Sequence, residues 1–292
     1  MRRHPKIHSL PLSALAYLLL AAPAVGALVA PPDPLPTPGA GPLGAGGVVA
    51  PGDLLGDHLW DDGLAEVSQF DLTQFRYGIL HQGGQVTLVV VREFLDPRRV
   101  VKARSDQPEN IPVMKGHLVK SFQTGVYRYD QSATVLMRRA DSIPLRLFIS
   151  SHEWCGSAGK SWINHGTGSQ LRVMSYFDGH GDFEQPLELP PAGVLEDSLW
   201  LWLRCWTPEA LSGKTLILIP TQLEARAQST EPITVTVQVR SDVQETVPAG
   251  TFPAVRVTLT PVASPAADGD GVFQPKGVAM TWEFTYERAA PR

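Results

Sequence analysis

Apolar and polar side chains alternate with a period of two along most of the chain from Asp53 onward. In residues 278–287, large apolar side chains at even positions alternate with small or polar side chains at odd positions. Residues 233–240 and 255–260 show the same alternation, built mainly from valine and threonine. A period of two is typical of strands that bury one face and expose the other to solvent.

Short turn sequences between the apolar segments predict antiparallel hairpins. The sequence Gln82-Gly-Gly-Gln85 separates residues 77–81 from residues 86–94, and residues 130–132 separate two further strands. About ten strands with few long connections favour antiparallel meanders. We therefore expect a mainly β fold, an antiparallel sandwich or a partly open barrel of about ten strands with one packed helix.

One segment has the periodicity of a helix. Apolar side chains fall on one helical face at Leu195, Leu199, Trp202, Leu203 and Trp206. Glu196 and Asp197 lie in the first turn of this helix, where the helix dipole favours anions. A strand is the alternative, because residues 199–205 also alternate, and Pro208 ends either element.

The first 27 residues have the parts of a signal peptide. Three cations, Arg2, Arg3 and Lys6, precede an uncharged stretch, and small residues lead to a cleavage point that we place after Ala27. An uncleaved membrane anchor is the alternative, because the uncharged stretch is just long enough to span a bilayer. Both interpretations predict export, with the remaining chain periplasmic, secreted, or anchored at a membrane by its N-terminus.

Residues 28–52 are rich in proline, glycine and alanine, with almost no charge and no aromatic side chain. Such a segment cannot bury enough apolar area to offset the entropy lost on ordering. We therefore expect a disordered linker at 28–52 and a single β-rich globular domain at 53–292.

Charge narrows the range of partners. The chain has 25 basic and 29 acidic residues, and removal of residues 1–27 takes away three cations and no anion. An acidic exported domain lacks the basic surface that drives nucleic-acid binding. We expect no nucleic-acid partner, and membrane contact only through an uncleaved N-terminal segment.

The chain has two cysteines, Cys155 and Cys205. Paired cysteines are the rule in an oxidising compartment, so we expect a disulfide between them. Leu145, Leu147 and Ile149 share one face of a predicted strand, and Cys155 continues their odd register toward the core. Two buried thiols and one reactive thiol are the alternatives.

His152, Glu153 and Cys155 form the densest group of reactive side chains. They suggest a thiol- or carboxylate-dependent hydrolase, but His152 and Cys155 point to opposite faces of an extended strand. A P-loop at Gly156–Ser161 is rejected, because Trp154 replaces the first glycine of that motif. The acidic loops 178–182 and 268–271 lack the further oxygen ligands of a calcium loop. We expect no metal and no cofactor.

Tryptophan is concentrated around the expected disulfide loop. The tryptophans concerned are Trp154, Trp162, Trp200, Trp202 and Trp206. Such side chains can line a site for an apolar or glycan ligand, and they can also build a core.

Residues Val247–Val257 resemble a turn and strand in exported bacterial proteins of the domain of unknown function 3108 type, and Met280–Glu287 is similar to the strand that follows. Segments Arg76–Gly78, Phe122–Gly125 and Glu153–Gly156 also resemble uncharacterised exported bacterial proteins. The resemblance implies a β-rich envelope protein and carries over no catalytic residue. Those proteins add a strand after the one matched by Met280–Glu287, so here we expect this strand at a sheet edge.

The patterns together favour a non-catalytic envelope or binding protein, with a concave sheet face near the tryptophans holding an apolar or glycan ligand. The alternative is a hydrolase that uses Cys155, His152 and Glu153, which requires an exposed thiol of low pKa. A purely structural scaffold is the third possibility, and it has no pocket.

Overall fold

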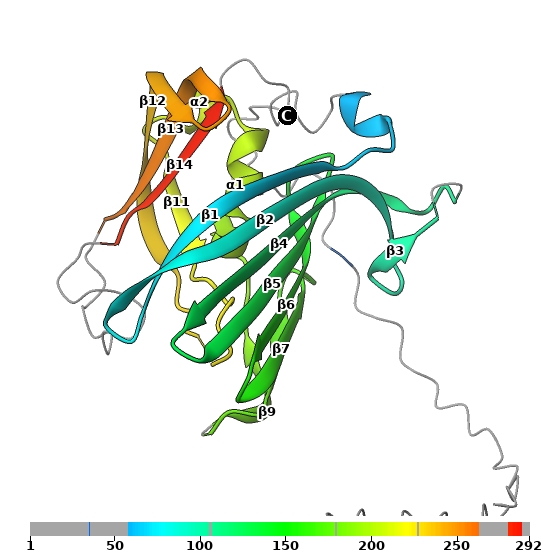
Figure 1. Ribbon diagram of the computed structural model, residues 1–292. Helices are drawn as coiled ribbons and strands as arrows, with labels where there is room; N and C mark the ends of the chain where they lie inside the picture. The colour runs from blue at the N-terminus through cyan, green and yellow to red at the C-terminus, as the bar shows by residue number, and fades with distance from the viewer. Residues whose placement is uncertain are drawn as a thin grey trace, which may run out of the picture. The chain divides into compact units, whose positions relative to one another are not determined.

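The computed structural model describes residues 35, 58–104, 107–178, 180–226, 228–262 and 280–287. These residues form fourteen strands in two sheets, with short helical segments (Figure 1). The predicted mainly β, mostly antiparallel fold is confirmed as two facing sheets that do not close into a barrel within the described part. The predicted signal peptide 1–27 and linker 28–52 lie outside the described residues, apart from Leu35.

The larger sheet is an antiparallel meander. In spatial order its strands are β1 (Glu66–Arg76), β2 (Ile79–Asp96), β4 (Ile111–Thr124), β5 (Tyr127–Arg138), β6 (Pro144–Glu153), β7 (Gly156–Ile163), β8 (Gln170–Ser175) and β9 (Gly181–Pro186). The short β3 (Val101–Ala103) pairs with the far end of β2, and the 3₁₀ turn η1 (His58–Asp61) precedes β1.

The smaller sheet comes from the C-terminal part of the chain. Its strands, in spatial order, are β10 (Gly193–Leu195), β11 (Thr215–Ile219), β12 (Ile233–Val247), β13 (Gly250–Pro261) and β14 (Trp282–Glu287). Only the β10–β11 pair is parallel among the described pairs. β14 lies at the edge of this sheet, as expected for the segment Met280–Glu287.

The predicted helix is present as a broken helical segment between the sheets: η2 (Glu196–Ser198), α1 (Leu199–Trp202) and η3 (Leu203–Cys205) (Figure 1). The short α2 (Pro208–Leu211) follows it. The prediction of a single apolar face was too narrow, because Leu199, Leu201 and Trp202 are all buried. The segment packs against both sheets, while Trp200 and Arg204 remain half-buried.

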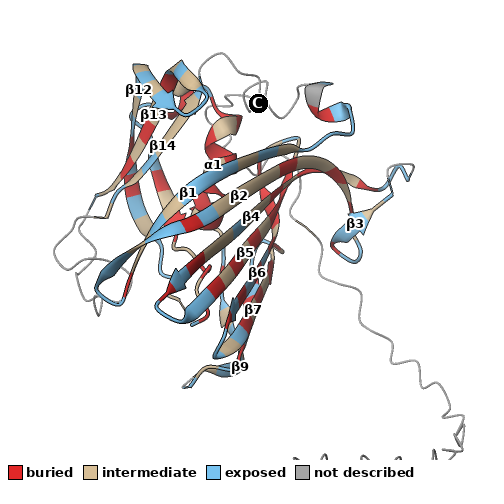
Figure 2. Ribbon diagram, in the orientation of Figure 1, coloured by how far each residue is buried: buried red, intermediate tan, exposed pale blue. Residues whose placement is uncertain are grey.

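The inner face of the larger sheet follows the predicted alternation. Leu145, Leu147 and Ile149 on β6 are all buried, as expected for side chains that share one face (Figure 2). Leu147 and Ile149 pack with Trp162 from β7 in a core that lies beside the core around the helical segment. The two cores together hold the sheets in place, because apolar area is removed from water on the inner face of each sheet.

The predicted turns at 82–85 and 130–132 were wrong, because β2 and β5 run straight through them. The β1–β2 turn lies at Tyr77-Gly78, where both residues have positive φ, as a tight hairpin turn requires. Gly84 instead marks an irregularity in the β1–β2 pairing, and a Cβ there would meet the backbone oxygen of Ser121 at 2.8 Å. This glycine therefore permits close strand packing and does not reverse the chain.

Candidate functional site

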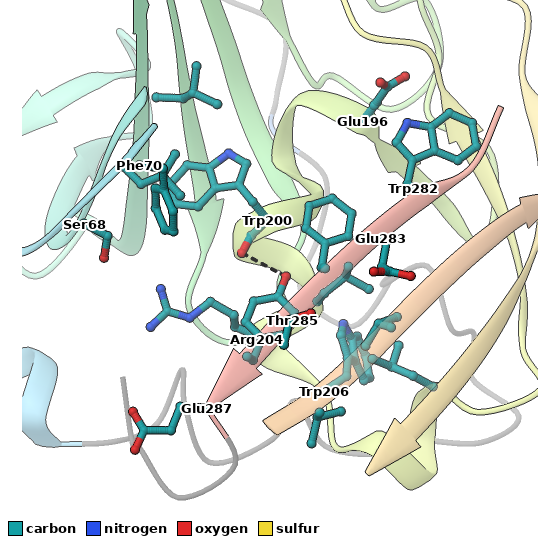
Figure 3. A pocket seen from close by; sticks show the side chains of 18 of the residues that line it. Ser68, Phe70, Glu196, Trp200, Arg204, Trp206, Trp282, Glu283, Thr285 and Glu287 are labelled. Carbon is teal, nitrogen blue, oxygen red and sulfur yellow. Dashed lines mark hydrogen bonds between the residues drawn. The ribbon is translucent and has the colours of Figure 1, made fainter. Parts of the chain in front are cut away.

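A cavity of about 1110 Å³ lies between the two sheets. It is lined by the edge strand β1 of the larger sheet, the edge strand β14 of the smaller sheet, and the helical segment (Figure 3). The two edge strands come from opposite ends of the described sequence, so the cavity exists only once both sheets have formed. Clefts of this size accommodate small-molecule ligands, which typically occupy sites of roughly 300 to 1,000 Å³.

Aromatic side chains form much of the cavity wall. They are Phe70 from β1, Trp200 and Trp206 from the helical segment and its end, and Trp282, Phe284 and Tyr286 from β14. The period of two along β14 places its three aromatic residues on the inner face. The hydroxyl of Tyr286 donates to the backbone oxygen of Trp200 at 3.3 Å and ties β14 to the helical segment (Figure 3).

Charged residues also line the cavity, namely Arg204 and the carboxylates Glu66, Glu196, Asp197, Glu209, Glu283 and Glu287. Arg204 forms a bidentate salt bridge with the carboxylate of Glu66, with N–O distances of 2.7 and 2.9 Å. The charge of the Arg204 guanidinium is therefore already neutralised. Glu196 accepts a hydrogen bond from the backbone N–H of Thr221 at 2.9 Å. Burial raises the pKa of Glu196 to about 7, because an apolar wall disfavours its charged form.

One buried donor in the wall has no partner. The indole N–H of Trp206 is buried and makes no hydrogen bond with any described residue. Trp206 also lines the cavity, and its side chain packs against that of Trp202 at a ring-centroid distance of 5.3 Å. An unpaired buried donor is costly, because the group has lost its hydrogen bonds to water.

Behind the loop 220–226, which carries cavity residues, lies a cluster of buried charges. Arg76 contacts Glu224 at 2.8 Å and Glu153 at 3.5 Å, and its guanidinium lies 4.4 Å from the ring centre of Tyr129. Lys160 is buried and donates to two backbone oxygens of the same loop. Burial lowers the pKa of Lys160 to about 8. These contacts fasten the loop to the inner face of the larger sheet.

Of the three predicted catalytic residues, only Glu153 and Cys155 lie close together. The thiol of Cys155 lies 3.5 Å from a carboxylate oxygen of Glu153, and partial desolvation together with this carboxylate raises the Cys155 pKa. His152 points to the opposite face, where its Nδ1 lies 2.7 Å from the hydroxyl of Ser157. A nucleophilic thiol needs a lowered pKa, whereas the pKa of Cys155 is raised, and the base within its reach is the carboxylate of Glu153, which also contacts Arg76.

The predicted disulfide is not formed, because Cys155 and Cys205 are both free. Cys205 is buried in the core, with its sulfur 3.9 Å from that of Met137, and burial raises its pKa to about 12. Cys155 lies exposed in the turn after β6, which ends at Glu153. The odd register that predicted an inward Cys155 does not extend beyond the end of the strand.

The five candidate tryptophans separate into three environments. Trp200 and Trp206, two of the predicted ligand-site residues, line the cavity. Trp162 and Trp202 are fully buried core residues, and the indole of Trp162 donates to the backbone oxygen of Leu187. Trp154 is 67% exposed at a turn. The prediction missed Trp282, although the alternation of 278–287 already placed it on an inner face.

The other motifs of the sequence form no site within the described residues. Residues Gly156–Ser161 lie within strand β7, and the acidic loop 268–271 lies outside the described residues. Across the described ranges, no group of three or more His, Cys, Asp or Glu side chains converges on a possible metal position. The described helices are also too short or too polar to cross a membrane.

Comparisons with known proteins add no relative. No protein-family model, no curated protein and no solved structure matches the chain.

Proposed function

We propose that this chain is an exported, non-catalytic binding protein that holds an apolar or amphipathic small molecule in the cavity between its sheets. The observation that carries the proposal is the cavity itself, about 1110 Å³ with largely aromatic and aliphatic walls. The export part of the proposal rests on the charge and hydrophobicity of residues 1–27.

The wall chemistry favours an apolar ligand over a glycan. A glycan needs many free donors and acceptors, whereas most charged groups of the wall are engaged by the protein itself. Arg204 is paired with Glu66, Glu196 and Asp197 accept from the backbone of the loop 220–226, and Glu283 lies 3.4 Å from Arg256. The remaining wall gains most from contact with hydrocarbon or aromatic surface, at roughly 25 cal/mol per Å² of apolar area removed from water.

The cavity is held open by structure that does not depend on a ligand. The Tyr286–Trp200 hydrogen bond fixes β14 against the helical segment, and the Arg76–Glu224 contact fixes the loop 220–226. A preformed site avoids the cost of ordering its wall when the ligand binds.

A neutral apolar fluorophore, N-phenyl-1-naphthylamine, tests the proposal. Ser68 lines the cavity from β1, while its neighbour Gln69 is exposed and does not line it. Ser68→Trp should fill part of the cavity, and Gln69→Trp adds the same bulk to the opposite face of the same strand. We expect saturable binding to the wild-type chain and to Gln69→Trp, and at least tenfold weaker binding to Ser68→Trp.

Two results would overturn the proposal. The first is the absence of saturable binding to the folded wild-type chain. The second is equal affinity of the Ser68→Trp and Gln69→Trp variants, which would place the fluorophore outside the cavity.

A further inference from the structure

We propose that the hairpin turns at one end of the strands of the larger sheet form a docking surface for an uncharged or zwitterionic lipid bilayer. We call this the tip surface and define it by its exposed apolar side chains, Tyr77, Val126, Tyr127, Trp154 and Tyr176. It is separate from the cavity, and this inference does not rest on the proposed ligand.

The meander brings these side chains together. In an antiparallel meander every second turn lies at the same end of the strands. The turns after β1, β4, β6 and β8 therefore lie at the same end of the sheet's strands. In Figure 1 these turns follow one another across the sheet. Each of these four turns carries at least one member of the tip surface.

The tip side chains are far more exposed than large apolar residues usually are. Tyr77 is 53% exposed, Trp154 67%, Val126 70% and Tyr176 79%, and the tips are marked as exposed in Figure 2. Single exposed apolar residues need no explanation, but their gathering on successive turns marks an interaction surface.

Neighbouring tips are in contact. A Cβ added to Gly156, directly after the Trp154-Cys155 turn, would lie 2.6 Å from the ring of Tyr176. The Tyr176 ring therefore lies against the β6–β7 hairpin. The hydroxyls of Tyr77 and Tyr129 are 3.2 Å apart and join the first hairpin to the second. These contacts join the first hairpin to the second and the third hairpin to the fourth.

The residue types identify the partner. Tryptophan and tyrosine are the residues enriched at membrane–water interfaces, where the ring lies among the headgroups and its polar atom stays wet. The sequences of the four turns contain no lysine or arginine, and Arg128 beside the second turn is paired with Asp130 at 2.9 Å. The tip surface consequently lacks the basic patch that holds proteins to anionic lipid, and apolar contact must supply the affinity.

Flotation with phosphatidylcholine vesicles tests this inference on the full chain. We expect the wild type to float with the vesicles, and Trp154→Ser/Tyr176→Ser to partition at least tenfold less. Val67→Ser is the matched control, because Val67 is 63% exposed near the start of β1, at the end of that strand away from the tips. All three proteins carry the same N-terminal residues, so a difference between them reports the tips.

A second measurement removes any contribution of the N-terminal segment to flotation. Vesicles of brominated phosphatidylcholine quench tryptophan only at bilayer depth, so part of the wild-type emission should be quenched. Trp154→Phe should lose that quenching while it retains flotation.

Several outcomes would overturn the inference. One is quenching that persists in Trp154→Phe, and another is equal flotation of the double variant and Val67→Ser. Binding restricted to anionic vesicles and abolished by salt would identify an electrostatic contact elsewhere. Self-association of the chain that is lost in Trp154→Ser/Tyr176→Ser, without vesicle binding, would identify a second copy as the partner.

Discussion

The carboxylate of Glu196 accepts a hydrogen bond from the backbone N–H of Thr221 at 2.9 Å, across the wall of the inter-sheet cavity. This contact links the start of the helical segment to the loop 220–226. It also holds a carboxyl group in an apolar setting, where its proton is retained to an unusually high pH.

Glu196 makes stability depend on pH. Its pKa is about 7 in the folded chain against an ordinary value of 4.5, so the folded chain binds the proton more tightly. The associated stability is complete below pH 4.5 and is lost as the pH rises through 7, with a total of about 3 kcal/mol. Glu196→Gln keeps the acceptor for Thr221 and cannot titrate.

Urea unfolding between pH 4.5 and pH 8 measures this effect. We expect the free energy of unfolding to fall more steeply with pH in the wild type than in Glu196→Gln. The comparison cancels the titration of groups that do not interact with Glu196. Identical slopes for the two proteins would contradict the assignment to Glu196.

The two thiols should differ sharply in reactivity. Cys155 is exposed and Cys205 is buried, so a maleimide should label one thiol in the folded chain and two after unfolding. Labelling of Cys155 should be slower than that of a free cysteine at the same pH, because its raised pKa leaves less thiolate. Peptide mapping by mass spectrometry checks the site, and a Cys155–Cys205 bridge would refute the prediction.

The buried charge cluster behind the cavity should be sensitive to loss of one partner. Arg76→Ala leaves Glu153 and Glu224 buried without their cation, which should lower the free energy of unfolding by about 3 to 5 kcal/mol. Arg172→Ala removes one half of an exposed pair with Glu184 and should cost less than about 1 kcal/mol. Comparable losses in urea unfolding would show that the cluster does not stabilise the loop.

A glycine on β4 supports the wall of the cavity. A Cβ on Gly116 would lie 2.9 Å from Leu201 and 3.0 Å from Trp200, whereas a Cβ on Gly159 meets nothing closer than 3.5 Å. Gly116→Ala should therefore destabilise the chain by about 1 to 3 kcal/mol through overpacking. Gly159→Ala should leave stability nearly unchanged, and thermal unfolding distinguishes the two. A neutral Gly116→Ala would mean that Trp200 can shift without cost.

The fold class was predictable because burial of one sheet face imposes a period of two on the sequence. That period correctly placed residues 145, 147 and 149 on one buried face. Turn positions were less predictable, because glycine occurs both in tight turns and where two strands pack closely. Gly84 allows close strand packing, while the turns lie at Tyr77-Gly78 and Gly125-Val126.

Individual residues of the site could be predicted from the sequence, but their assembly into one cavity could not. Trp200 and Trp206 were singled out as ligand candidates, but their meeting with Phe70 and Trp282 depends on the pairing of distant strands. The same holds for Arg76, Glu153 and Glu224, which lie far apart in the sequence and meet across the sheet and a loop. No local pattern encodes such long-range contacts, which is also why the disulfide prediction was wrong.

The central claim is that the cavity between the sheets is the ligand site, and ¹⁹F NMR of the chain labelled with 5-fluorotryptophan tests it most directly. Each of the seven tryptophans gives one signal, assigned through single Trp→Phe variants. On titration with N-phenyl-1-naphthylamine, we predict that the signals of Trp200, Trp206 and Trp282 shift together and that the signal of Trp154 stays in place. A shift of Trp154 alone, or no saturable shift of the three cavity tryptophans, would contradict the account.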